Sequence, residues 1–327
     1  MDTMKNAVGS RQAHGADAAR QLVGTGEYTA SHALGDFAAA IADAGLGSPD
    51  IIADGEIHRF RADEDKAGTK NAWYCVFADG RPAGAFGSWK TGERHTWSAG
   101  GRDSLTAAER DAIHRTLQAA KARRAAELAK RYASAADEAT RIIERSAPAA
   151  ADHPYLVRKG IQGHGIRQQG LALVIPVTTT GAELTSVQFI CPDGSKRFLK
   201  GGGMRGGHYV IGSNITRREV VVCEGFATGA TLHQETGALV YVAFNAGNLE
   251  LVARGAMRRH PSAPIIIAAD NDAWTQGNPG LTKARAAALA TGAKLLTPDF
   301  SGMDTSTNPT DWNDWYAIRR AAERAEA

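Results

Sequence analysis

The chain has 327 residues, a length typical of about two domains. With 43% hydrophobic, 22% charged and 7% aromatic residues, its composition is that of a folded globular protein and excludes a chain that is disordered throughout. The formal net charge is only +3, so any binding to nucleic acid must come from local clusters of Lys and Arg.

No run of 18 apolar residues occurs, and the first residues, MDTMKNAVGSRQ, lack the apolar segment of a signal peptide. We therefore expect a cytoplasmic protein that has no membrane partner. Cys75, Cys191 and Cys223 are far apart in the sequence and form no CxxC pair. This spacing predicts neither a zinc site nor a disulfide framework.

The N-terminal part of the chain divides into three predicted segments. Residues 1–25 are polar, rich in Gly and Ala and without periodicity, which predicts a flexible arm. Residues 26–103 begin with a helical stretch around 31–44, and the short aromatic and β-branched runs that follow, separated by Gly-rich turns, predict a small antiparallel β-rich module. Residues 104–147 contain apolar residues at helical intervals and predict a long helical linker, broken once.

The C-terminal part begins after the hinge-like sequence APAAADHP at 147–154. Within 148–217, the runs LALVIPV, LTSVQFI and HYVIG predict strands of a mixed α+β subdomain. Within 218–327, unbroken apolar strands alternate with helices predicted at 226–236, 248–260 and 279–291. This alternation predicts an α/β domain with a parallel sheet and helices on both faces.

Two of the predicted parallel strands end in acidic residues. VVVCE ends at Glu224, and PIIIAAD ends at Asp270 with Asp272 two residues later. Ligands of open parallel sheets bind outside the carboxyl ends of the strands, and clustered carboxylates attract a cation. Oxygen ligands without His or Cys favour Mg²⁺ or Mn²⁺ over zinc, and such sites serve phosphoryl or nucleotidyl transfer. Either acid alone could instead be a helix N-cap, but their joint occurrence favours a metal site.

The string CEGFATGATLH, followed 46 residues after Glu224 by ADND, resembles the Toprim domain of replicative primases, topoisomerases, OLD-type nucleases and recombination mediators. EGFATG is similar to the EGYATA-type signature of primases from satellite phages and conjugative plasmids, with Phe226 and Gly229 in place of the usual Tyr and Ala. The resemblance covers about residues 50–316. It implies catalysis and metal binding by Glu224, Asp270 and Asp272.

The segment from LALVIPV to HYVIG resembles the N-terminal half of the primase catalytic core. The resemblance implies that cations near the DGSKRFLKGG turn guide template and nucleotide, although a solvated hairpin tip is the simpler interpretation. The predicted nucleotide- or template-binding residues are Lys196, Arg197, Lys200 and Arg205, with Arg158 and Lys159 as further candidates that a surface turn also explains.

An acidic motif near the C-terminus and two tryptophans near the N-terminus could also contact the metal or DNA. DWND at 311–314 is placed like the terminal acidic motif of primases, so Asp311 or Asp314 could approach the metal. Trp89 and Trp97 alternate with cations and could stack on DNA bases, although tryptophans are more often part of a core.

These observations together predict a DNA primase that makes primers on single-stranded DNA from nucleoside triphosphates with Mg²⁺ or Mn²⁺. No GxxxxGK[ST] motif is present, so a helicase partner would be a separate protein. The alternatives are a metal-dependent Toprim nuclease, which uses the same acids, and a non-catalytic single-stranded-DNA-binding accessory protein.

Overall fold

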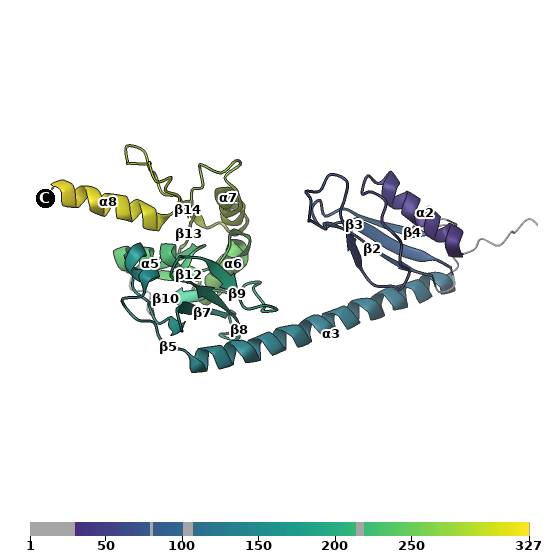
Figure 1. Ribbon diagram of the computed structural model, residues 1–327, viewed down its shortest axis with the longest axis horizontal. Helices are drawn as coiled ribbons and strands as arrows, with labels where there is room; N and C mark the ends of the chain where they lie inside the picture. The colour runs from purple at the N-terminus through teal and green to yellow at the C-terminus, as the bar shows by residue number, and fades with distance from the viewer. Residues whose placement is uncertain (1–29, 79–80, 101–106, 214–218, 327) are drawn as a thin grey trace, which may run out of the picture. The chain divides into compact units, whose positions relative to one another are not determined.

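The structure is a computed structural model that describes residues 30–78, 81–100, 107–213 and 219–326 (Figure 1). The chain divides into two compact units, residues 1–125 and 126–327, and each is described by itself. The predicted arm at 1–25 lies outside the described residues.

In the described part of the N-terminal unit, a helix packs on an antiparallel sheet, as predicted. The sheet has the order β1-β2-β3-β4, and helix α2 (Ala30–Asp43) packs on one face (Figure 1). Phe37 of α2 contacts the rings of Tyr74 and Phe86 at centroid distances of 6.1 and 5.7 Å. The strands are β1 (His58–Phe60), β2 (Ala72–Phe77), β3 (Ala83–Ser88) and β4 (Arg94–Ser98).

Helix α3 (Ala107–Arg145) is continuous, whereas the sequence analysis expected one break. Residues 104–146 contain neither Gly nor Pro, so the backbone has no residue that interrupts the helical hydrogen bonds. The C-terminal turns of α3 belong to the second unit. There Ala139 and Ile142 are buried against Val174 and Val187 of a sheet.

That sheet is antiparallel in the order β5-β6-β7-β8-β9. α3 covers one of its faces, and the other face joins a core shared with the C-terminal α/β domain. Helix α4 (Pro154–Lys159) lies between the first two strands in the chain. The strands are β5 (Ala147–Pro148), β6 (Arg167–Gln169), β7 (Ala172–Thr178), β8 (Leu184–Ile190) and β9 (Lys196–Phe198).

The C-terminal domain is the predicted parallel sheet with helices on both faces. Its order is β10-β12-β11-β13-β14, with bounds β10 (Tyr209–Ile211), β11 (Val220–Cys223), β12 (Leu239–Val242), β13 (Ile265–Ala268) and β14 (Lys294–Leu296). All pairs are parallel except β10 with β12. β10 comes from the segment before the predicted domain and adds an antiparallel edge strand.

The helices of this domain begin and end at the signals in the sequence. Helix α5 (Phe226–Thr236) ends at Gly237 and α7 (Pro279–Thr291) at Gly292, both in the left-handed region that favours glycine. α6 (Leu249–Arg259) ends before Pro261, and α8 (Trp312–Glu326) packs on α5. One core lies between α5 and the β7–β8 sheet, and a second lies under α6 and α7. Among the described residues, no helix is long and apolar enough to cross a membrane.

Candidate active site

The two predicted acidic positions leave the parallel sheet at the same edge. β11 and β13 are neighbours in parallel register, with Cys223 opposite Ala268. Glu224 follows the first strand directly, and Asp270 follows the second by two residues. Because parallel strands end at a common edge, both carboxylates lie where ligands of such sheets bind.

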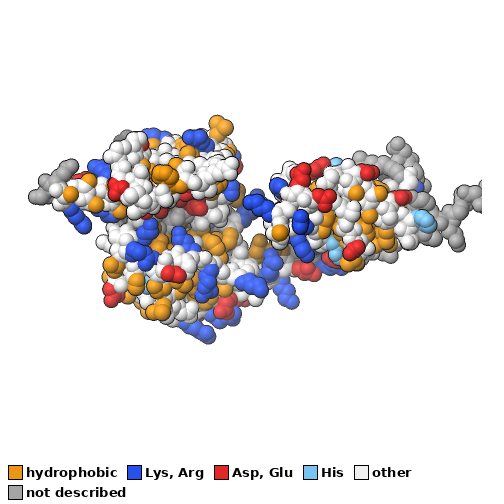
Figure 2. Space-filling model, turned by 45° about the horizontal axis from the view of Figure 1, so that its top comes forward, with side chains coloured by type: hydrophobic (Ala, Val, Ile, Leu, Met, Phe, Trp, Pro, Cys, Tyr) orange, Lys and Arg blue, Asp and Glu red, His pale blue; other side chains and the backbone are white. Residues whose placement is uncertain are grey.

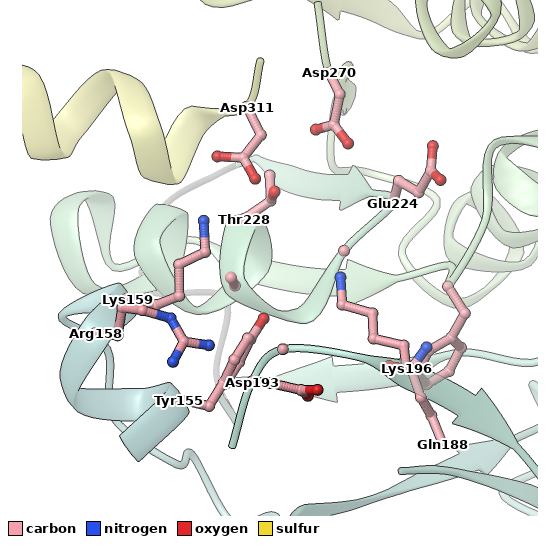
Figure 3. Close-up of a pocket in the computed structure, with 14 residues that line it drawn as sticks. Tyr155, Arg158, Lys159, Gln188, Asp193, Lys196, Glu224, Thr228, Asp270 and Asp311 are labelled. Carbon is pink, nitrogen blue, oxygen red and sulfur yellow. The ribbon is translucent and has the colours of Figure 1, made fainter. Parts of the chain in front are cut away.

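A cavity of about 360 Å³ lies at this edge (Figure 3). In this view Asp270 lies between Asp311 and Glu224, and the amines of Lys159 and Lys196 lie on the opposite side of the cavity. The lining thus combines elements that are far apart in the sequence. The lining residues are Tyr155, Arg158, Lys159, Gln188, Asp193, Gly194, Lys196, Glu224, Gly225, Ala227, Thr228, Phe244, Asp270 and Asp311.

The carboxylates of the cavity are close enough to oppose each other's ionisation. Burial, and then the charges of Asp311, Glu224 and Asp272, raise the pKa of Asp270 to about 8. Burial raises the pKa of Glu224 and of Asp311 as well. Oδ1 of Asp270 is buried and has no hydrogen-bond partner among the residues that the structure describes. A buried acceptor without a partner, among like charges, is a position that a cation would stabilise.

Lys196 supplies positive charge to this group of acids. Its charge lowers the pKa of Glu224, Asp270 and Asp311, although burial outweighs the effect in each case. In the described part of the chain, its amine makes no ion pair within 4 Å. Lys196 is therefore available to a ligand in the cavity.

Asp272 is near the acids but does not line the cavity. Its charge raises the pKa of Glu224 and Asp270, while a Cβ on Gly280 of α7 would lie 3.1 Å from its Oδ2. Within the described ranges, no three His, Cys, Asp or Glu side chains are arranged closely enough to hold a metal ion on their own. The acids thus form a group around Asp270 rather than a preformed cage.

The structure separates the cations that the sequence analysis grouped with Lys196. The guanidinium of Arg197 lies 4.1 Å from the centre of the Phe189 ring, on the α3 side of the sheet. Adjacent residues of a strand point to opposite faces, so Arg197 cannot share the cavity with Lys196. Lys200 lines a groove beside α3, and Arg205 lines a cavity with Asn245. None of these three residues lines the acid cavity.

Arg158 and Lys159 line the cavity but are engaged within the protein. Nη1 of Arg158 donates to the carbonyl of Pro192 at 2.7 Å, and its guanidinium lies 5.7 Å from the centre of the Tyr155 ring. The amine of Lys159 pairs with Asp314 at 3.3 Å. Arg158 therefore holds the turn that precedes Lys196 through Pro192. Lys159 links α4 to the DWND segment through its ion pair with Asp314.

The DWND residues have different roles. Asp311 lines the cavity, whereas Asp314 accepts a hydrogen bond from the Thr310 amide at 3.0 Å and pairs with Lys159. Asn313 is 2% exposed and donates to the carbonyl of Lys159 at 2.7 Å and to the hydroxyl of Thr231 at 2.8 Å. Of the two acids, Asp311 is thus the one beside Asp270.

Two residues were not predicted from the sequence: Thr228, which lines the cavity, and Asn313, which bonds to the carbonyl of the cavity residue Lys159. Thr228 is 1% exposed, lies four residues after Glu224 in the first turn of α5, and lines the cavity. Its position inside the EGFATG string was a usable signal. Asn313 lies inside the DWND string, but its partners are 82 and 154 residues away in the sequence, so the string does not indicate which residues it contacts.

The two tryptophans of the N-terminal unit differ in exposure. The ring of Trp97 lies 5.2 Å from that of Phe37 and packs against the core of the unit. Trp89 is 58% exposed and lies 5.4 Å from Trp73. The prediction of base stacking therefore stays with Trp89, since Trp97 contributes to the fold.

Comparison with known proteins identifies the C-terminal domain first. Residues 219–322 match the family model described as the Toprim domain. This match covers the parallel sheet, the acidic positions and the DWND segment. The chain therefore carries a Toprim domain, as the CEGFATG and ADND motifs predicted.

The relatives extend the similarity over most of the chain. Two proteins named DNA primase TraC from Escherichia coli are 34% identical over 291 residues and 32% identical over 305 residues. The alignments cover 81% and 90% of this chain but 26% and 20% of the relatives. The chain is thus a homologue of these primases and spans about a quarter or less of their length.

Solved structures show a weaker similarity. A chain in a structure of the bacteriophage T7 lagging-strand DNA polymerase with primase domains is 14% identical, with a TM-score of 0.37 over 56% of this chain and 90% of that chain. The primase fragment of the T7 primase-helicase protein is 14% identical, with a TM-score of 0.36 over 52% of this chain and 72% of that one.

Proposed function

We propose that the chain is the catalytic part of a DNA primase, which joins nucleoside triphosphates into a short primer on a single-stranded DNA template. The observation that carries this proposal is the buried, unpartnered carboxylate oxygen of Asp270, among Glu224 and Asp311 and opposite Lys196, in a homologue of DNA primases.

The donor set fits Mg²⁺ or Mn²⁺ and contains no ligand typical of zinc. Asp270 would hold the ion, with Asp272 or Asp311 as an additional ligand. Mg²⁺ in proteins usually takes one or two carboxylates and fills its other positions with water and substrate phosphates, so a preformed cage is not required. When bound, the ion would stabilise the attacking and leaving oxygens of nucleotidyl transfer.

The residues of the chain itself would bind and orient the nucleotide. Lys196 would pair with the triphosphate, because it lines the cavity and, among the residues that the structure describes, its amine has no carboxylate within 4 Å. The first turn of α5, which carries Thr228, faces the same cavity, and the partial positive charge of a helix N-terminus favours phosphate.

Glu224 is suited to accept a proton from the attacking 3′-hydroxyl. Burial raises the pKa of Glu224 toward neutral pH, and a general base is most effective when its pKa is close to the pH of the reaction. The backbone of Ala246 and the charge of Lys196 lower the pKa of Glu224, but burial and the charge of Asp272 outweigh them. Single-stranded DNA and nucleoside triphosphates are the proposed partners, and any helicase that acts with the chain would lie outside these 327 residues.

Primer synthesis from labelled nucleotides on single-stranded templates tests the proposal. We expect products in Mg²⁺ or Mn²⁺, their loss in Asp270→Asn and Glu224→Gln, and normal synthesis in Asp152→Asn. Asp152 is an exposed carboxylate outside the cavity and serves as the matched control. Absence of product from the unchanged chain on varied templates, or cleavage of DNA without added nucleotides, would contradict the proposal.

A further inference from the structure

A groove beside α3 lies on the opposite face of the β5–β9 sheet from the acid cavity. It has a volume of about 560 Å³ and is formed by one stripe of α3 and by the two residues that follow β9. The lining residues are Glu127, Lys130, Arg131, Ser134, Ala135, Glu138, Arg141, Leu199 and Lys200.

The cations of this groove exceed its acids, and most have no ion pair. Arg141 pairs with Glu138 at 2.7 Å. Over the described ranges, Lys130, Arg131 and Lys200 have no carboxylate within 4 Å, and all three are exposed. The four cations outnumber the two acids, Glu127 and Glu138, so the groove is net positive and attracts an anion with several charges. On the face of the molecule that Figure 2 shows, Lys and Arg side chains occur together with Asp and Glu side chains.

The wall that carries Lys200 is fixed by close packing of a glycine turn. A side chain on Gly202 would overlap the hydroxyl of Ser186 in β8. Gly201 has a φ of +84°, and a Cβ there would lie 3.3 Å from Cγ of Arg131. The turn therefore lies directly against α3, which holds Lys200 across the groove from the α3 cations.

We propose that this groove binds the sugar–phosphate backbone of single-stranded nucleic acid, as a second contact in addition to the acid cavity. The nature of the ligand rests on the proposed function, whereas the anion-binding character rests on the groove itself. Unpaired Lys and Arg side chains bind backbone phosphates, and such contacts do not depend on base sequence. Tyr132, which is 41% exposed with the Arg131 guanidinium 5.9 Å from its ring, offers a surface for a base.

The position of β9 connects the two contacts. Lys196 at its start lines the cavity, and Lys200, two residues after its end, lines the groove. Nucleic acid bound in the groove would therefore contact Lys200, which is four residues after Lys196 in the sequence, and Lys196 faces the acids. This arrangement would keep a template or product bound while the cavity exchanges nucleotides.

The test is the binding of a fluorescent single-stranded oligonucleotide to the full chain by anisotropy, without nucleotides or divalent ions. Lys130→Ala with Lys200→Ala should weaken binding about tenfold or more at 0.1 M salt. It should also reduce the slope of log K against log salt by about 1.4, since each phosphate contact to a single strand contributes about 0.7. The control is Arg285→Ala with Lys294→Ala, which removes two exposed cations elsewhere and should change neither quantity.

The outcomes separate this proposal from the proposed function. Unchanged affinity and salt slope in the groove variant, with primers made normally, would overturn the groove proposal alone. Weakened binding in the groove variant, with no primers from the unchanged chain, would support the groove and contradict primase activity. Equal losses in the groove variant and in the control would overturn the groove, because binding would then follow net charge only.

Discussion

Replacing Asp270 by Asn should stabilise the metal-free protein while it abolishes primer synthesis. The pKa of the Asp270 carboxyl is about 8 in the folded chain, against an ordinary value of 3.8. Between these values the folded state retains a proton that the unfolded state releases, so stability falls as the pH rises. From pH 3.8 to pH 7, at about 1.4 kcal/mol per pH unit, retaining this proton costs the folded state about 4 kcal/mol. Asn removes that cost and keeps the shape of the side chain.

Urea unfolding of the full chain in EDTA measures this effect. We expect Asp270→Asn to raise the free energy of unfolding of the C-terminal unit by a few kcal/mol at pH 7–8. The gain should fall below about 1 kcal/mol at pH 4, because the carboxyl is then protonated in the folded state and only partly ionised in the unfolded state, where its pKa has the ordinary value of 3.8. Mg²⁺ should then stabilise the wild type and not the variant, because a ligand stabilises only the state that binds it. An Asp270→Asn protein that is no more stable than wild type at pH 8 would refute this reasoning.

Three other substitutions test particular contacts. Lys196→Gln should raise the KM for nucleotides about 10- to 100-fold, as expected for loss of a charged hydrogen bond, and steady-state kinetics with unchanged stability would verify it. Asn313→Ala removes the hydrogen bond to the Lys159 carbonyl and should cost about 1–3 kcal/mol in urea unfolding; an unchanged midpoint would contradict the role given to it. Gly229→Ala places a Cβ 2.7 Å from Cγ2 of Val242 and should cost about 1–3 kcal/mol, so a variant as stable as wild type in thermal unfolding would disprove the clash.

The sequence predicted the acidic edge of the domain well, because it depends on local patterns. The apolar runs before Glu224 and Asp270 specify buried parallel strands, and the ends of such strands meet at one edge. The helix ends at Gly237 and Gly292 were also predictable, since a helix stops readily at a glycine in the left-handed region.

The basic residues and the DWND motif could not be assigned from the sequence alone. The face to which Lys196 or Arg197 points depends on how β9 pairs with β8, and a strand of three residues carries no alternation that fixes this pairing. Asn313 and Asp314 bond to Lys159 at the end of α4, more than 150 residues earlier in the chain. Such contacts are set by the packing of whole elements rather than by local patterns.

The most direct test of the acid cavity is the binding of Mn²⁺ to the full chain at pH 7.5, followed by electron paramagnetic resonance. The account predicts that the wild type and Asp152→Asn bind the ion equally well and that Asp270→Asn binds it at least tenfold more weakly. Equal Mn²⁺ affinity in the wild type and Asp270→Asn would show that Asp270 does not hold the ion, and the proposed chemistry would lose its basis.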